Sequence, residues 1–120
     1  MAVVDVPQLT PGILLEFGVL AGTYGLSTSE HTVGSFVGQV LSQIPEVEYV
    51  LLMKEENFLN IWTVIDDFDR TVRHQIYLIE FDIMGKFPEL LFDFHVISRR
   101  GRPAQTVLPS EGTVIFFRRP

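Results

Sequence analysis

The stretch from residue 47 to residue 97 constrains the fold most. Two apolar runs, 47–54 and 58–65, flank the polar residues 55–57, which is the pattern of a β-hairpin. A helix-like segment follows, and then another apolar run at 90–97. A strand, a helix and a second strand in this order form a right-handed crossover with parallel strands. The sequence therefore predicts a mixed sheet that carries the helix on one face.

The helix in this stretch has clear start and stop signals. Asp66, Asp67 and Asp69 come where carboxylates can bind the free N–H groups of a first turn and face the positive end of the helix dipole. Gly85 suits the left-handed residue that often follows a helix, and Pro88 prevents continuation. The pattern predicts a helix from near Asp67 to near Gly85.

Apolar residues occupy more than one side of that helix. Those that recur at helical spacing and are expected to face the sheet are Phe68, Val72, Ile76, Ile79 and Ile83. Tyr77, Phe81 and Met84 widen the apolar surface. We therefore expect the helix to contact more than one layer of the protein.

Both strands of the hairpin are apolar on both faces. In the first strand, Tyr49 and Leu51 point to one face and Val50 and Leu52 to the other. The second strand also has apolar residues on both faces. Strands that are buried on both faces lie in the middle of a sheet. The hairpin is therefore predicted to be central.

An earlier amphipathic helix precedes the hairpin. Ser27 and Glu30 have the spacing of a capping box, and Pro45 marks the end. Its apolar stripe consists of Val33, Phe36, Val37, Val40, Leu41 and Ile44. After the crossover, residues 98–109 have the composition of a loop, 110–112 that of a turn, and 113–118 that of a last short strand.

These elements predict an α+β fold of two main helices packed on a mixed sheet of about four strands, in the order α-β-β-α-β-β. At 120 residues the chain is long enough for one domain with a real core. We divide it into an N-terminal arm, residues 1–29, and a single domain, residues 30–120.

The arm contains an apolar stretch, Ile13–Tyr24, which is interpreted as an added strand or as a segment that docks on a partner. It is too short for a transmembrane span and contains Glu16. No basic residue precedes it, as a signal peptide would require. We expect no membrane association. The chain has no cysteine, which excludes disulfides, thiolate nucleophiles and cysteine zinc sites and fits a cytoplasmic location.

The net charge of −6 is unevenly distributed. The basic residues of the C-terminal end are Arg99, Arg100, Arg102, Arg118 and Arg119. The first 97 residues hold 4 basic and 14 acidic side chains. A basic end on an acidic body favours a polar contact surface or association between copies.

The order of elements, with the sequences of residues 47–65 and 70–97, resembles the minimal nucleotidyltransferase fold. Residues 111–116 resemble the closing segment of that family, so the likeness covers roughly residues 30–117. The family includes small antitoxin-like proteins that pair with helical toxins. The resemblance implies a binding partner and, in active members, nucleotidyl transfer.

The chain departs from the motifs of that family. Residues 53–56, Met-Lys-Glu-Glu, stand where a Gly-Ser pair is expected, and residues 58–60, Phe-Leu-Asn, stand where Asp-x-Asp is expected. Asp93 alone matches the third carboxylate. One carboxylate cannot hold two magnesium ions and order a triphosphate. A member of this kind would lack the chemistry, and we expect no cofactor.

Asp93 and His95 lie two residues apart on a predicted strand and therefore share a face. A carboxylate beside an imidazole is the beginning of a general-base pair. No serine or cysteine nucleophile motif accompanies it, so a hydrogen-bonded structural pair is the favoured interpretation.

Asp66 and Asp67, with Asp69 and the glutamates of the hairpin turn, are candidates for a hard cation site. Their spacing matches no calcium loop. Capping of the long helix is the favoured interpretation, and none of the three histidines has metal-ligand spacing.

The five C-terminal arginines, together with Phe116 and Phe117, combine cations and aromatic rings as single-stranded nucleic-acid binders do. The acidic character of the whole chain argues against this function.

The favoured hypothesis is a non-catalytic binding or protein-interaction domain, either a homodimer or bound to another protein. We expect Ile13–Tyr24 or the terminal strand to contribute to a homodimer contact, because exposed apolar edges favour pairing. The alternatives are a metal-dependent enzyme or nucleotidyltransferase relative that uses Asp93 and His95, and a nucleic-acid accessory protein.

Overall fold

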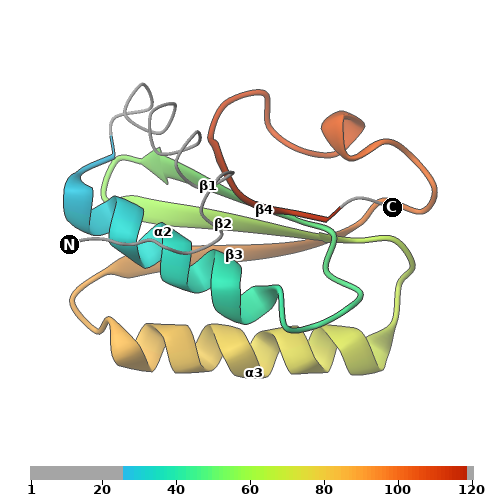
Figure 1. Ribbon diagram of the computed structural model, residues 1–120, viewed down its shortest axis with the longest axis horizontal. Coiled ribbons are helices and arrows are strands. Elements are labelled where there is room, and N and C mark those ends of the chain that lie inside the picture. The colour runs from blue at the N-terminus through green and yellow to red at the C-terminus, as the bar shows by residue number, and fades with distance from the viewer. Residues whose placement is uncertain (1–25, 119–120) are drawn as a thin grey trace.

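The computed structural model describes residues 26–118 (Figure 1). Within that range the helices are α2 (Thr28–Leu41) and α3 (Arg70–Lys86), with a short 3-10 helix at Ala104–Thr106. The strands are β1 (Tyr49–Glu55), β2 (Phe58–Ile65), β3 (Leu91–Ser98) and β4 (Thr113–Phe117). The predicted α+β class and the order α-β-β-α-β-β are confirmed.

The sheet has the strand order β3-β2-β1-β4. β1 and β2 form an antiparallel hairpin, and β4 pairs antiparallel with the other side of β1. β2 and β3 are parallel, joined through α3. The predictions of a central hairpin and a parallel crossover are therefore confirmed, and β3 and β4 form the two edges.

Both helices lie on one face of the sheet, and the connection from β3 to β4 arches away on the other side (Figure 1). The core between helices and sheet is made by completely buried side chains from both layers. They include Val37, Leu41, Val50, Ile61 and Ile76. Burial of such side chains contributes most of the favourable free energy of folding.

α2 begins with the predicted capping box. The Ser27 hydroxyl accepts the N–H of Glu30 at 3.2 Å, and the Ser27 N–H donates to Glu30 Oε1 at 2.9 Å. Further along the helix, a Cβ at Gly38 would collide with the backbone oxygen of Ile115. A glycine at this position lets α2 pack directly on β4. The helix ends at Leu41, ahead of Pro45.

The start of α3 differs from the prediction. The helix begins at Arg70, and Asp69 is its N-cap, accepting the N–H groups of Thr71 (2.9 Å) and Val72 (3.2 Å). One carboxylate in the right place satisfies these donors. Asp66 and Asp67 therefore lie outside the helix and do not cap it.

Two further predictions for α3 are wrong. Phe68 precedes the helix and is 54% exposed instead of facing the sheet. The Arg73 guanidinium lies 4.8 Å from the centre of its ring. Gly85 lies within the last turn, because the helix continues to Lys86 and closes with the Phe87 N–H bound to the Ile83 oxygen at 3.1 Å.

The outer side of α3 does not pack on a second layer within residues 26–118. Tyr77, Phe81 and Met84, expected to widen the buried face, are exposed, as is Leu78. Val72, Ile76 and Ile83 are buried against the sheet and Ile79 is partly buried, as predicted. The helix therefore has one covered and one uncovered apolar side.

The predicted arm, residues 1–29, with its apolar stretch Ile13–Tyr24, lies outside the described residues except for its last residues, which begin α2. Neither helix of the described part combines the length and the apolar character needed to cross a bilayer.

Replacing Ile76 by Ala should destabilise the protein by about 2–5 kcal/mol, because this wholly buried side chain would leave a cavity under the sheet. Chemical denaturation measures the change. Gln75→Ala is the control, since Gln75 is exposed on the same helix. Equal effects for the two variants would contradict the assigned face of α3.

Candidate functional site

The strand register brings together a polar cluster on the sheet face opposite the helices. Asn60 lies beside Asp93, and Trp62 beside His95, on the parallel strands β2 and β3. The His95 and Trp62 rings stack with centres 4.0 Å apart and an angle of 14°. His95 Nε2 lies 3.2 Å from Asn60 Oδ1 and 3.4 Å from Asp93 Oδ2. Asp93 and His95 thus share a face, as strand alternation predicts.

The chemistry of this cluster follows from its acceptors. Asn60 Oδ1 and Asp93 Oδ2 are both acceptors, so this arrangement suits the tautomer in which His95 Nε2 carries the hydrogen. Stacking on Trp62 holds the ring in its plane. Nucleophilic catalysis needs a hydroxyl or thiol next to the imidazole, whereas the neighbours here are an amide, a carboxylate and an indole. The geometry favours a structural hydrogen-bonded cluster.

A small hollow of about 190 Å³ lies at the hairpin end of the same sheet. Its lining residues are Glu55, Glu56, Phe58, Asn60 and Asp93. These are positions at which the nucleotidyltransferase resemblance expects catalytic motifs, so the fold gathers them at one place. His95 is not in the lining. Within residues 26–118 no three histidine, aspartate or glutamate side chains are grouped to hold a metal ion.

Asp66, another candidate metal residue, has a structural role. Asp66 Oδ1 accepts the N–H of Gly101 at 2.8 Å and lies 3.7 Å from Arg99 Nη1. The Asp66 backbone oxygen accepts the N–H of Arg100, also at 2.8 Å. Asp66 therefore fixes the loop that follows β3, and Asp67 remains exposed beside it.

Arg99, the first of the C-terminal arginines, is engaged within the protein. Its Nε donates to Glu48 Oε1 at 2.6 Å and its Nη2 to Glu48 Oε2 at 3.3 Å. This hydrogen-bonded carboxylate raises the pKa of Arg99. Such a two-point contact fixes both side chains, so Arg99 connects the loop after β3 to the start of β1.

Arg118 is engaged in a similar way, through backbone oxygens. It donates to those of Val47 at 3.1 Å and Ser42 at 2.8 Å, and its guanidinium lies 4.9 Å from the Phe116 ring centre. Arg100 and Arg102 are exposed, and Arg119 lies outside the described residues. The arginines predicted as a nucleic-acid contact thus include two that hold the fold together.

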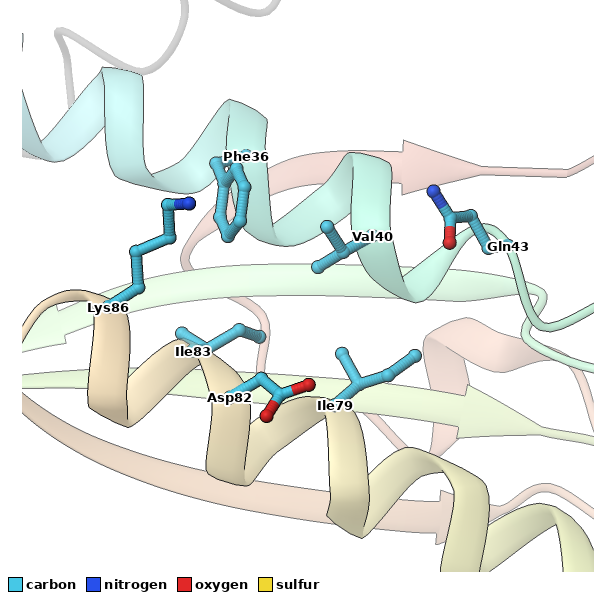
Figure 2. A pocket seen from close by; sticks show the side chains of 7 residues that line it. All are labelled: Phe36, Val40, Gln43, Ile79, Asp82, Ile83 and Lys86. Atoms are coloured by element: carbon cyan, nitrogen blue, oxygen red, sulfur yellow. The ribbon is translucent and has the colours of Figure 1, made fainter.

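A larger groove, of about 560 Å³, lies between α2 and α3 (Figure 2). Phe36 and Val40 on α2 face Ile79 and Ile83 on α3, and polar side chains stand at the rim. Lys86 reaches across, with its Nζ 5.3 Å from the Phe36 ring centre. Four of its lining residues are apolar and three are polar or charged, which suits contact with side chains.

Within residues 26–118, the largest group of exposed apolar side chains lies on the outer face of α3, here called the α3 strip. It consists of Tyr77, Leu78, Phe81 and Met84, which are 49%, 55%, 73% and 42% exposed. Arg73 Nη1 donates to the Tyr77 hydroxyl at 3.3 Å on its flank. From the sequence, Tyr77, Phe81 and Met84 were expected to widen the apolar face and contact a further layer, and Leu78 was not included.

Sequence analysis missed Glu80, which lies on the covered side of α3 and is 7% exposed. Among the described residues, its Oε2 atom has no hydrogen-bond partner. Burial raises the pKa of Glu80 to about 7, because desolvation disfavours the charged form. The signal available in the sequence was its place one turn after Ile76, on the flank of the buried stripe.

Glu80 makes stability depend on pH. The pKa of Glu80 is higher in the folded than in the unfolded state. Its contribution to the free energy of unfolding is therefore fully present below pH 4.5 and is lost as the pH rises toward about 7. Relative to Glu80→Gln, the wild type should lose up to about 3 kcal/mol of unfolding free energy between pH 4.5 and pH 8. Denaturant titrations at several pH values measure this, with Glu46→Gln, at an exposed position away from α3, as control. Parallel pH profiles for wild type and Glu80→Gln would contradict it.

Comparison with known proteins gives no family for this chain. No protein-family model matches the sequence, and no curated protein matches it either. The nucleotidyltransferase resemblance therefore stays a prediction.

Proposed function

We propose that this chain is a protein-interaction module that acts by contact, and that two copies of it associate through the α3 strip. The observation that carries the proposal is Phe81, which is 73% exposed at the centre of the strip. Large contiguous apolar patches on a protein surface mark interaction sites. Aromatic side chains and methionine are enriched at such contacts.

The size of the strip suits an interface between two copies. At roughly 200 Å² for a large side chain, its exposed fractions leave about 400 Å² per copy. Two copies would remove about 800 Å² from water, and flanking side chains would bring the total near the 1,000 Å² or so of a specific interface. An interface of this area is at the small end of the range for specific contacts.

The charges along α3 favour an antiparallel arrangement of the two helices. The first turn of α3 has no acidic residue and begins with Arg70, which faces the positive end of its own helix dipole. A two-fold axis near Leu78 and Phe81 would bring Arg70 of each copy to the C-terminal end of the other helix, beside Glu89. Each Arg70 would then face the negative end of the other helix and the Glu89 carboxylate, and both of these contacts are favourable. The same surface serves both copies.

This contact differs from the one expected from the sequence. That expectation placed the homodimer contact at Ile13–Tyr24, which lies outside the described residues, or at the terminal strand. β4 does form an edge of the sheet, and Phe117 is 45% exposed on it. The α3 strip is the more extensive apolar surface, and α3 is therefore the proposed contact.

Phe81→Glu should convert the dimer to a monomer, because it places a charge at the centre of the contact. Sedimentation velocity at micromolar concentration measures the change. Gln75→Glu is the matched control, since it adds the same charge to an exposed position of α3 outside the strip and should leave the dimer intact. A monomeric wild type, or a dimer that persists in Phe81→Glu, would overturn the proposal.

We also propose that the protein does not catalyse nucleotidyl transfer. With magnesium and ATP, the purified protein should transfer no nucleotide to itself or to a partner, because the Gly-Ser and Asp-x-Asp positions hold other residues. Incorporation of labelled AMP measures this. Incorporation that is lost in Asp93→Ala but kept in the control Asp82→Ala would contradict this part of the proposal.

A further inference from the structure

β3 forms one edge of the sheet, and within residues 26–118 no strand pairs with its outer side. An edge strand presents a row of backbone N–H and C=O groups that can pair with a further strand. β4, the other edge, has five residues and a register shift against β1. β3 has eight residues in continuous register with β2. The longer and more regular edge is therefore the better template for another strand.

Alternate residues of β3 direct their backbone groups outward. Directly after the strand, the Arg99 N–H donates to the Ile65 oxygen of β2 at 2.8 Å. Both backbone groups of a strand residue point to the same side, and successive residues alternate between the two sides. The odd-numbered residues of β3 therefore face β2, and the outward-facing ones are Phe92, Phe94 and Val96. In agreement with this, the Val96 oxygen accepts a hydrogen bond from Arg73 Nη2 on α3 at 3.3 Å.

This edge adjoins the α3 strip. Arg73, which reaches Val96, also donates to the Tyr77 hydroxyl at 3.3 Å. Tyr77 therefore lies on the side of α3 that is next to the outer edge of β3, and Met84 lies two turns further along the same side. A second copy that contacts the strip through these residues would bring its own β3 to the same edge.

Two β3 strands are self-complementary when they pair antiparallel about Phe94. With Phe94 opposite Phe94 of a second copy, Phe92 lies opposite Val96. At each of these positions, outward-facing backbone groups meet outward-facing groups and can form the hydrogen-bonded pairs of an antiparallel ladder.

The side chains on the sheet face opposite the helices favour the same register. Asp93 would lie opposite His95 of the second copy, which pairs an acceptor with a donor. These side chains are 56% and 31% exposed in the single chain. Leu91, which is 51% exposed, would lie opposite Ile97. The two neighbouring registers would instead place Asp93 opposite Asp93, or His95 opposite His95.

The positions of β3 and α3 agree with one common two-fold axis. The two elements run in opposite directions, because Arg73 near the start of α3 contacts Val96 near the end of β3. Phe94 is two residues from Val96, or about 6.6 Å, which corresponds to about four residues of helix. An axis through Phe94 therefore passes α3 near Tyr77 and Leu78, close to the axis of the proposed helix contact.

We propose that two copies of the chain also join their β3 strands antiparallel, with Phe94 at the two-fold axis, so that their sheets form one continuous sheet. This inference rests on the proposed α3 dimer and adds the sheet edge to the same interface. In the pairing, Arg73 releases the Val96 oxygen to the Phe92 N–H of the second copy. The backbone groups of both edges are then hydrogen-bonded to each other, and each edge is covered.

Amide hydrogen exchange, followed by NMR on the full chain, tests the pairing. The amides of Phe92, Phe94 and Val96 should be protected in the wild-type dimer and should exchange about tenfold faster or more in the Phe81→Glu monomer, because the pairing hydrogen bonds are lost. The amides of Asp93 and His95 are the control, since they face β2 and should stay protected in both.

The two proposals fail in different ways. A wild-type dimer in which the outward-facing amides of β3 exchange as fast as in the monomer would overturn the sheet pairing and leave the α3 contact standing. A wild type that is monomeric by sedimentation would overturn both.

Disulfide formation tests the register, because the chain has no native cysteine. Asp93→Cys and His95→Cys, one of them tagged, are mixed and oxidised. In the proposed pairing these positions face each other with Cα atoms about 4.5 Å apart, within the range of a disulfide, whereas identical positions are diagonal at about 7–8 Å. Disulfides should therefore form mainly between the two variants, and the control Gln75→Cys on α3 should link to neither. Mixed disulfides that are no more abundant than those between identical variants would overturn the inference.

Discussion

The apolar character of both faces of the central hairpin is the constraint on which this structure depends. Ile61 and Val64 point to opposite faces of β2, and both are completely buried. Neither face can therefore be left to water, and each must be covered. The two helices cover the first face because the crossover from β2 to β3 places α3 beneath the sheet and Gly38 lets α2 lie against β4. The remaining elements form the edges of this arrangement.

The fold was predictable because its signals are local. Continuous apolar runs identified the strands, and the capping box at Ser27 identified the first helix. The errors arose where several residues were equally suited to one role. Asp66, Asp67 and Asp69 all precede α3, and only the folded protein selects Asp69, since Asp66 instead binds the distant backbone of Gly101. Helix limits depend on such long-range competition, which sequence spacing does not contain.

The candidate site was less predictable, because its contacts join residues far apart in the chain. Strand alternation placed Asp93 and His95 on one face, but the Asn60 and Trp62 contacts depend on the parallel register of β2 and β3. Arg99 changes from a free cation to a structural residue through Glu48, from an earlier part of the chain. The exposure of Phe81 was hidden for another reason. A helix with two apolar sides has the same sequence whether a layer of its own chain or a partner covers the second side.

The proposed α3 contact lies on the outside of the helix layer. Val72, Ile76 and Ile83, on the other side of α3, hold this helix on the sheet. The two sides of α3 therefore have separate roles, one in the fold and one in the proposed contact. The association of two α3 helices is bimolecular and is lost at low concentration. The helix contact would thus act as a reversible interaction.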